Sequence, residues 1–309
     1  MCHTALERVY DLEPSERTLE NLQNLMRVAW SEMRMKDEYK HLFDVPASRK
    51  KSDGEDEGHA ERDLHAEIEW GQSALQLLNR YVQMEDPQNV VNPNPLEQEI
   101  WVKTNLTINP SAGVTGNTAD SHMKEDSDDS STFLIRGIVD RIDLAPAPVS
   151  GSTESNDMVL CIIDYKTGKA PNLKYSSVVN KRILDEAFWQ LKVYALIIRE
   201  MRLSAGKGTY SNLKNTLDLR LLRLMYLNSE KGTGVTIDFD MGETETERDC
   251  MLQEVHADLA SVWTKINELV KSQDPKGFVH CDRKFCWCHK VRPQFLPGTV
   301  WEREVVNNP

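Results

Sequence analysis

The sequence predicts an α/β protein with a core of about five mixed strands flanked by helices, an N-terminal helical region and a Cys-rich C-terminal tail. Three observations support this class. Apolar residues recur at three- and four-residue steps near both ends of the chain, which is the spacing of amphipathic helices. Apolar runs of strand length follow one another in the middle. A strongly helical segment lies between the third and fourth of these runs.

The first ninety residues are expected to be helical. Helices are predicted over residues 4–11 and 15–36, where leucines and other apolar residues share one face. A longer helix is expected from Glu61 to Met84. Its buried side should carry the apolar residues Leu64, Ile68, Leu75, Leu78 and Val82.

Residues 95–241 are expected to form the strand core. The predicted strands cover residues 100–108, 132–144, 158–166, 217–228 and 234–241. Polar inserts over 110–131 and 145–157 separate the first three strands, which favours an antiparallel meander. A helix over 181–203 should precede the fourth strand.

A last helix is predicted over residues 243–273, followed by the Cys-rich tail over 275–298. The sequence contains no internal repeat. We therefore expect one domain that covers residues 1–309.

Composition and charge exclude several classes of protein. Lys and Arg number 37 against 49 Asp and Glu, so the net charge of −12 excludes a histone-like or uniformly basic nucleic-acid binder. Hydrophobic residues make up 39% of the chain, enough for a real core. No apolar run approaches the roughly 18–20 residues of a membrane span, and the N-terminus is not a secretory signal. We expect an intracellular protein, with cytoplasm, nucleus and organelle all open.

Two stretches are nevertheless basic. Residues 164–192 hold six bases against three acids, and residues 271–292 hold six against two. Local fields govern contact with phosphates, so these stretches are candidates for binding nucleic acid with little base readout. They are also compatible with two solvated surfaces.

Two acids lie at the ends of apolar strand runs. Asp140 follows Gly137-Ile138-Val139, and Asp164 precedes Tyr165-Lys166. Alternation sends the side chains of Asp164 and Lys166 to the same face. A carboxylate beside apolar neighbours is costly unless it is paired, and a divalent cation held by two carboxylates would pair both. Lys166 could then assist attack on a phosphodiester. The alternative is an ordinary ion pair of Asp140 with Arg141 or Lys166.

These motifs resemble a known family. The runs G-I-V-D-R-I-D, I-I-D-Y-K-T-G-K and Q-L-K-V-Y-A are similar to the RecB-like exonuclease branch of the PD-(D/E)XK nuclease superfamily. The segment that begins His3-Thr4-Ala5-Leu6-Glu7 is similar to its helical entry, and the cysteine tail to its C-terminal module. The resemblance implies a restriction-endonuclease-like core and a metal-dependent deoxyribonuclease of DNA repair or recombination, working with a separate helicase subunit and with no membrane.

The resemblance also implies roles for single residues. The side chains of His3, Asp140 and Asp164 and the backbone carbonyl of Tyr165 would bind Mg²⁺ or Mn²⁺. Asp140 and Asp164 would be catalytic with Lys166, and the Q-x-x-x-Y motif adds Gln190 and Tyr194 near the scissile strand.

Two of these assignments have alternatives. Gln190 and Tyr194 fit simple amphipathic packing of their helix. His65 lies in a local pattern similar to that of His3, so it is a second candidate ligand, although a solvated helix face also explains it.

The cysteine tail offers a second metal site. Thiolate clusters select zinc or iron–sulfur centres, and Cys281, Cys286 and Cys288 are close enough in sequence to share one. The resemblance implies a 4Fe–4S cluster. Cys2, His280 and His289 are possible fourth ligands, and cysteines that only pack are equally compatible.

Three functions are consistent with the sequence. The first is a Mg²⁺- or Mn²⁺-dependent DNA nuclease, expected to be an exonuclease. The second is a catalytically inactive nuclease fold retained as a DNA-binding or assembly subunit. The third, a structural protein with a zinc tail, leaves the acids at the strand ends unexplained.

Overall fold

The computed structural model describes most of the chain, and its ranges are 1–45, 62–88, 97–108, 132–148, 157–204 and 217–273. The chain divides into two compact units, Met1–Ala257 and Asp258–Pro309. In the described part, no helix is both long enough and apolar enough to span a membrane.

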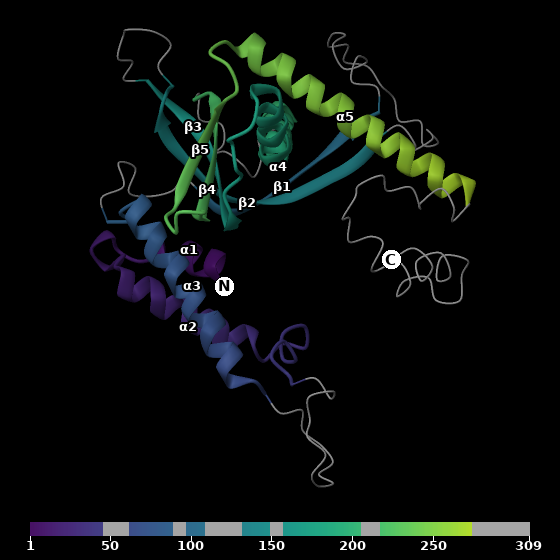
Figure 1. Cartoon of the computed structure of the whole chain (residues 1–309). Coiled ribbons are helices and arrows are strands. Elements are labelled where there is room, and N and C mark those ends of the chain that lie inside the picture. The colour runs from purple at the N-terminus through teal and green to yellow at the C-terminus, as the bar shows by residue number, and fades with distance from the viewer. Residues whose placement is uncertain (46–61, 89–96, 109–131, 149–156, 205–216, 274–309) are drawn as a thin grey trace. The chain divides into compact units, whose positions relative to one another are not determined.

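A five-stranded mixed sheet forms the centre of the first unit (Figure 1). Its strands follow chain order and are β1 (Glu97–Thr107), β2 (Thr132–Pro146), β3 (Met158–Lys169), β4 (Leu219–Asn228) and β5 (Val235–Asp240). All neighbours are antiparallel except β3 and β4, which are parallel. Helix α4 (Ser177–Ser204) makes the crossover that a parallel pair requires. The predicted α/β class, mixed sheet and antiparallel meander are confirmed.

The other helices agree with the predicted segments. They are α1 (Cys2–Val9), a 3-10 turn (Pro14–Glu16), α2 (Leu19–Met33), α3 (Leu64–Met84) and α5 (Glu245–Ser272). Side-chain caps define two of the starts: Thr18 accepts a hydrogen bond from the backbone N–H of Asn21, and Asp63 accepts one from that of Ala66.

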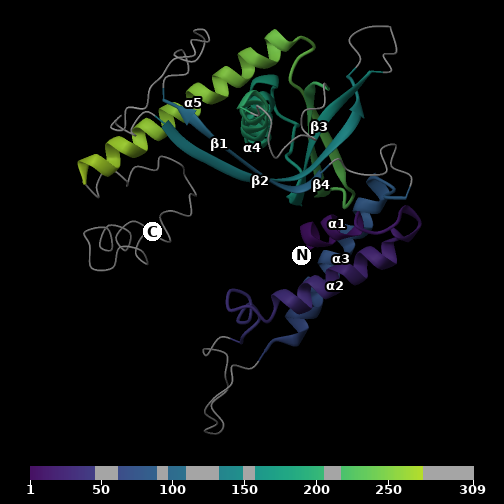
Figure 2. The ribbon, with the colours of Figure 1, turned by 180° about the vertical axis from the view of Figure 1, so that it is seen from behind.

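The two faces of the sheet are covered by different helices (Figures 1 and 2). On one face, buried residues of α1, α2 and α3 pack with alternate residues of β3, Cys161, Ile163 and Tyr165. Helix α4 covers the other face and packs against β1, β2, β3 and β4. Because β3 is buried on both sides, its sequence is almost continuously apolar up to Asp164.

Two details differ from the predictions. Strand β2 continues to Pro146, because Ala145 and Pro146 still pair with β3, so the loop expected from residue 145 begins later. Leu64 and Ile68 of α3 are exposed rather than buried. At that end α3 instead contacts its neighbours through an aromatic cluster that consists of Trp70, Trp30 and Phe43.

Candidate active site

The sheet forks where β2 and β3 part. The last pair of their ladder is Arg141 with Ile163, and the next residues outward are Asp140 and Asp164. Beyond this point β2 stays paired with β1, while β3 stays paired with β4. The backbone N–H of Tyr165 therefore has no ladder partner on β2, and it donates to Asp140 Oδ2 at 2.9 Å. The fork brings the two predicted acids to one place.

Both acids of the fork are poorly solvated. The side chain of Asp164 is 6% exposed and that of Asp140 is 20% exposed. Burial raises the pKa of both carboxyls, and the charge of Asp164 raises the pKa of Asp140 further. Two carboxylates held near each other in this way attract a cation.

Lys166 connects Asp164 to helix α4. Its Nζ atom lies 2.6 Å from Asp164 Oδ2 and donates to Gln190 Oε1 at 3.0 Å. Gln190 Nε2 in turn donates to the Tyr194 hydroxyl at 2.7 Å. Asp164 and Lys166 thus lie on the same face, as alternation predicts, and the Q-x-x-x-Y pair interacts across one helical turn.

Gly137 on β2 makes room for this chain of contacts. A Cβ atom there would lie 2.5 Å from Cε1 of the Tyr194 ring, closer than side chains tolerate. Glycine therefore lets the Tyr194 ring pack directly against the backbone of β2, three residues before Asp140. The sequence alone did not connect Gly137 with Tyr194, because they belong to elements far apart in the chain.

His3 lies at the same fork. Its Nε2 atom is 2.9 Å from the Tyr165 carbonyl oxygen and 3.6 Å from Asp140 Oδ2. Ala5 and Leu6 of α1 are buried and hold the helix in place, while the side chain of His3 remains 42% exposed. His65, the alternative ligand, is 84% exposed on α3 beside Glu69.

Arg141 does not form an ion pair with Asp140, which was one alternative left open by the sequence. Its guanidinium binds both oxygens of Glu85, at 2.7 and 2.9 Å, and Asp143 Oδ2 at 2.5 Å. It also donates to the hydroxyl of Tyr165 at 2.6 Å. The alternative of an ordinary Asp140–Arg141 ion pair is therefore wrong. The other possible partner, Lys166, is bound to Asp164.

We call this group the arginine cluster; its members are Arg141, Glu85, Asp143, Tyr165, Tyr10 and Tyr81. It connects α1 and α3 to β2 and β3. Sequence reasoning missed it, because Tyr10, Tyr81 and Glu85 all lie far from Arg141 in the chain.

The donors at the fork suit a hard divalent cation, although they do not form a closed cage. Among the described residues, no group of three or more His, Cys, Asp or Glu side chains is arranged to hold a metal ion. Asp164 Oδ2 is nonetheless buried, and its contact with Lys166 lacks hydrogen-bond geometry. A buried carboxylate oxygen without a hydrogen bond, beside a second acid, fits Mg²⁺ or Mn²⁺. In the structure, Lys166 supplies the positive charge.

The cysteine tail, with Cys281, Cys286 and Cys288, lies outside the described residues. Of the cysteines that the structure describes, Cys2 and Cys161 are buried and Cys250 is exposed, all three as free thiols.

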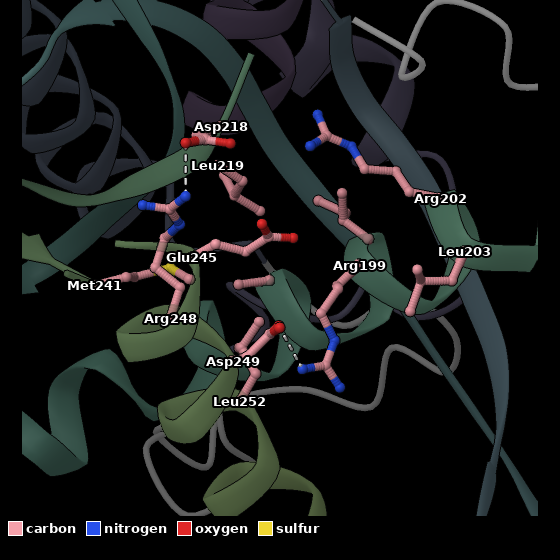
Figure 3. A pocket seen from close by; sticks show the side chains of 12 residues that line it. Arg199, Arg202, Leu203, Asp218, Leu219, Met241, Glu245, Arg248, Asp249 and Leu252 are labelled. Carbon is pink, nitrogen blue, oxygen red and sulfur yellow. Dashed lines mark hydrogen bonds and ion pairs between the residues drawn. The ribbon is translucent and has the colours of Figure 1, made fainter. Parts of the chain in front are cut away.

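A separate pocket of about 190 Å³ lies between α4, β4 and the start of α5 (Figure 3). None of the predicted site residues lines it. Its charges largely pair with each other: Arg199 contacts Asp249 at 3.1 Å, and Arg248 contacts Asp218 at 2.6 Å. We therefore place the candidate chemistry at the fork rather than in this pocket.

Comparison with known proteins gives a family match. The sequence model of the PD-(D/E)XK nuclease superfamily matches residues 1–290, nearly the whole chain. No curated protein and no solved structure matches the chain significantly.

Proposed function

Because the chain belongs to the PD-(D/E)XK nuclease superfamily, we propose that it hydrolyses phosphodiester bonds of DNA at the fork between β2 and β3, using Mg²⁺ or Mn²⁺. Membership suggests nuclease activity, since the superfamily typically consists of metal-dependent phosphodiesterases. The observation that carries the proposal is the pair of poorly solvated acids, Asp140 and Asp164, with Lys166 in contact with one of them. We also propose the finer assignment, an exonuclease of the RecB-like branch that acts in DNA repair or recombination beside a separate helicase.

Asp140 and Asp164 are the residues that would hold the cation, with His3 and the Tyr165 carbonyl oxygen on the same side. His3 already lies 2.9 Å from that oxygen. When bound, the cation supplies charge neutralisation at the phosphate and makes water a better nucleophile.

We assign to Lys166 the stabilisation of the negative charge that develops on the phosphate during hydrolysis. Lys166 Nζ contacts Asp164 Oδ2 in the structure; with Asp140 and Asp164 holding a cation, Nζ would be available for a phosphate oxygen. Gln190 accepts from Nζ and is itself held by Tyr194, so the two α4 residues orient the lysine. Preorganised charge of this kind is typically worth about 10²–10³ in rate.

The test compares the full-length protein with Lys166→Ala on end-labelled single- and double-stranded DNA, with Mg²⁺, Mn²⁺ or EDTA. We expect metal-dependent cleavage that falls at least about 100-fold in Lys166→Ala. The matched control is Lys40→Ala, which removes an exposed lysine whose ion pair in the described structure is with Asp37, and it should cleave normally. The product ladder gives polarity.

A second candidate is a nuclease fold that binds DNA without cutting it. It is favoured by the Lys166–Asp164 ion pair and by the lack of a closed metal cluster in the described part of the chain. DNA binding without cleavage in any metal would support it. Equal cleavage by wild type and Lys166→Ala would instead overturn the role assigned to the lysine.

A further inference from the structure

Within the described part of the chain, one face of the β1–β2 hairpin carries exposed side chains, opposite the face that α4 covers. The register pairs Trp101 with Ile138, Lys103 with Arg136 and Asn105 with Leu134, so these residues share that face. Val102 and Leu106 alternate with them and are buried. Trp101 is 62% exposed and Leu134 is 61% exposed. We call the four residues Trp101, Lys103, Leu134 and Arg136 the hairpin platform.

The charges of the hairpin platform contradict what a stable sheet prefers. Lys103 and Arg136 are directly opposite each other on antiparallel strands, and like charges in that position repel. Neither makes an ion pair with another residue that the structure describes, although this protein has an excess of acids. A surface that places two cations side by side, with no ion pair to either among the described residues, is arranged for an anionic ligand.

The chemistry of the platform identifies the ligand. Lys and Arg recognise phosphate oxygens, and an exposed tryptophan is a stacking surface for an unpaired base. Stacking of this kind is tolerant of sequence and needs bases that are not already paired. A duplex presents its phosphates but not the faces of its internal bases.

The platform also leads to the candidate active site. Along β2, Arg136 is followed by Ile138 and then by Asp140 at the fork. Four residues of strand span roughly 13 Å, so a strand bound on the platform is within a short reach of the fork.

We propose that the hairpin platform binds a single-stranded segment of the nucleic-acid substrate, by stacking on Trp101 and by phosphate contacts to Lys103 and Arg136. This inference rests on the proposed function and adds to it the strandedness of the substrate and its direction of approach.

The test measures the affinity of the full-length Lys166→Ala protein in EDTA for a fluorescent 15-nucleotide oligo(dT) and for a blunt duplex of equal length. Without metal and without the lysine, the DNA stays intact during the titration. Adding Trp101→Ala should raise the Kd for the single strand about 5- to 100-fold. Trp101→Phe should restore most of the affinity, because a ring is again available for stacking.

Removing both cations, by Lys103→Ala with Arg136→Ala, should lower the slope of log K against log salt by roughly 1.4, or about 0.7 for each single-strand phosphate that is no longer neutralised. The matched control removes Arg27 and Lys36, two exposed bases at the α2 end of the molecule; it should change neither the Kd nor the slope. Trp101 is exposed, so circular dichroism should be unchanged in every variant.

The outcomes separate the platform from the proposed function. If Trp101→Ala binds the single strand as tightly as its parent, or if the duplex depends on the platform equally, the platform proposal is overturned while Lys166-dependent cleavage can still stand. If the parent binds no DNA and the wild type cleaves none, both proposals fail. A dimer by light scattering that Trp101→Ala dissociates would assign the face to a second copy of this chain instead.

Discussion

Two neighbouring residues of β2 belong to two different kinds of charge cluster. Arg141 is almost completely buried, and it is bonded to Glu85, Asp143 and tyrosine hydroxyls on several elements. Asp140 lies one residue away at the fork, beside a second acid, with a backbone N–H as its closest donor. Both clusters place ionisable groups out of water, but Arg141 contacts both acids of its cluster, whereas Lys166 contacts one of the two acids at the fork, Asp164.

The pKa of Glu85 and that of Asp140 shift in opposite directions, although burial also raises the pKa of Asp143 in the arginine cluster. In the arginine cluster, burial by itself raises the pKa of Glu85, but the hydrogen bond and charge of Arg141 outweigh it and leave that pKa below its usual value. At the fork, burial and the Asp164 charge leave the pKa of Asp140 raised. The first cluster is held together by Arg141, whereas the second, under the proposed function, would be stabilised by an added cation. This contrast separates a structural cluster from the proposed catalytic one within the same strand.

The largest expected effect tests how much the arginine cluster stabilises the fold. Arg141→Ala leaves Glu85 and Asp143 buried without a counter-charge, so it should lower the free energy of unfolding by about 3–5 kcal/mol in urea titrations. The control is Arg223→Ala, because its ion pair with Asp238 is partly exposed and should be worth about 0–1 kcal/mol. If the two variants lost similar amounts of unfolding free energy, the buried contacts of Arg141 would be no more stabilising than a partly exposed ion pair.

The next prediction tests whether the acids at the fork bind a divalent cation. Mg²⁺ or Mn²⁺ at 100 times its Kd should raise the free energy of unfolding of the wild type by about 2.7 kcal/mol, because only the folded chain assembles the site. Asp164→Asn should lose most of this gain, and Asp238→Asn, at an acid outside both clusters, should retain it. Thermal unfolding with and without metal measures both. A full gain in Asp164→Asn would show that metal binds elsewhere.

Tyr165 takes part in both clusters through different atoms, which allows a sharper test. Its hydroxyl accepts from Arg141, while its backbone N–H and carbonyl contact Asp140 and His3. Tyr165→Phe should therefore lower the free energy of unfolding by about 1–2 kcal/mol and leave cleavage within a few-fold of wild type. A 100-fold loss of cleavage in a folded Tyr165→Phe protein would mean that the clusters are not separable.

The smallest effect has the opposite sign. The folded-state pKa of Asp140 is raised, so the ionised carboxylate at pH 7 favours the unfolded chain. Asp140→Asn removes this charge and keeps an oxygen that can accept the Tyr165 N–H. Without metal it should raise the free energy of unfolding, by on the order of 1 kcal/mol, while abolishing cleavage. A destabilised Asp140→Asn protein would show that Asp140 is structural.

Much of the fold follows from local sequence patterns. Apolar periodicity predicted the helices and strands within a few residues, because each element buries a face whose spacing is fixed by its own geometry. Alternation placed Asp164 and Lys166 on one face, and the structure brings them within 2.6 Å. The same reasoning failed for Leu64 and Ile68 of α3, which are apolar at the predicted positions but are not covered by any residue that the structure describes.

The sequence by itself determined the class of fold, the family and the segments that carry Asp140, Asp164 and Lys166. These depend on residues close together in the chain. Tertiary structure decided which charges meet: Arg141 binds Glu85 rather than its neighbour Asp140, and Tyr194 rests on Gly137. Such pairings join residues 56 or more positions apart, and they depend on where the sheet forks and on which helix covers each face.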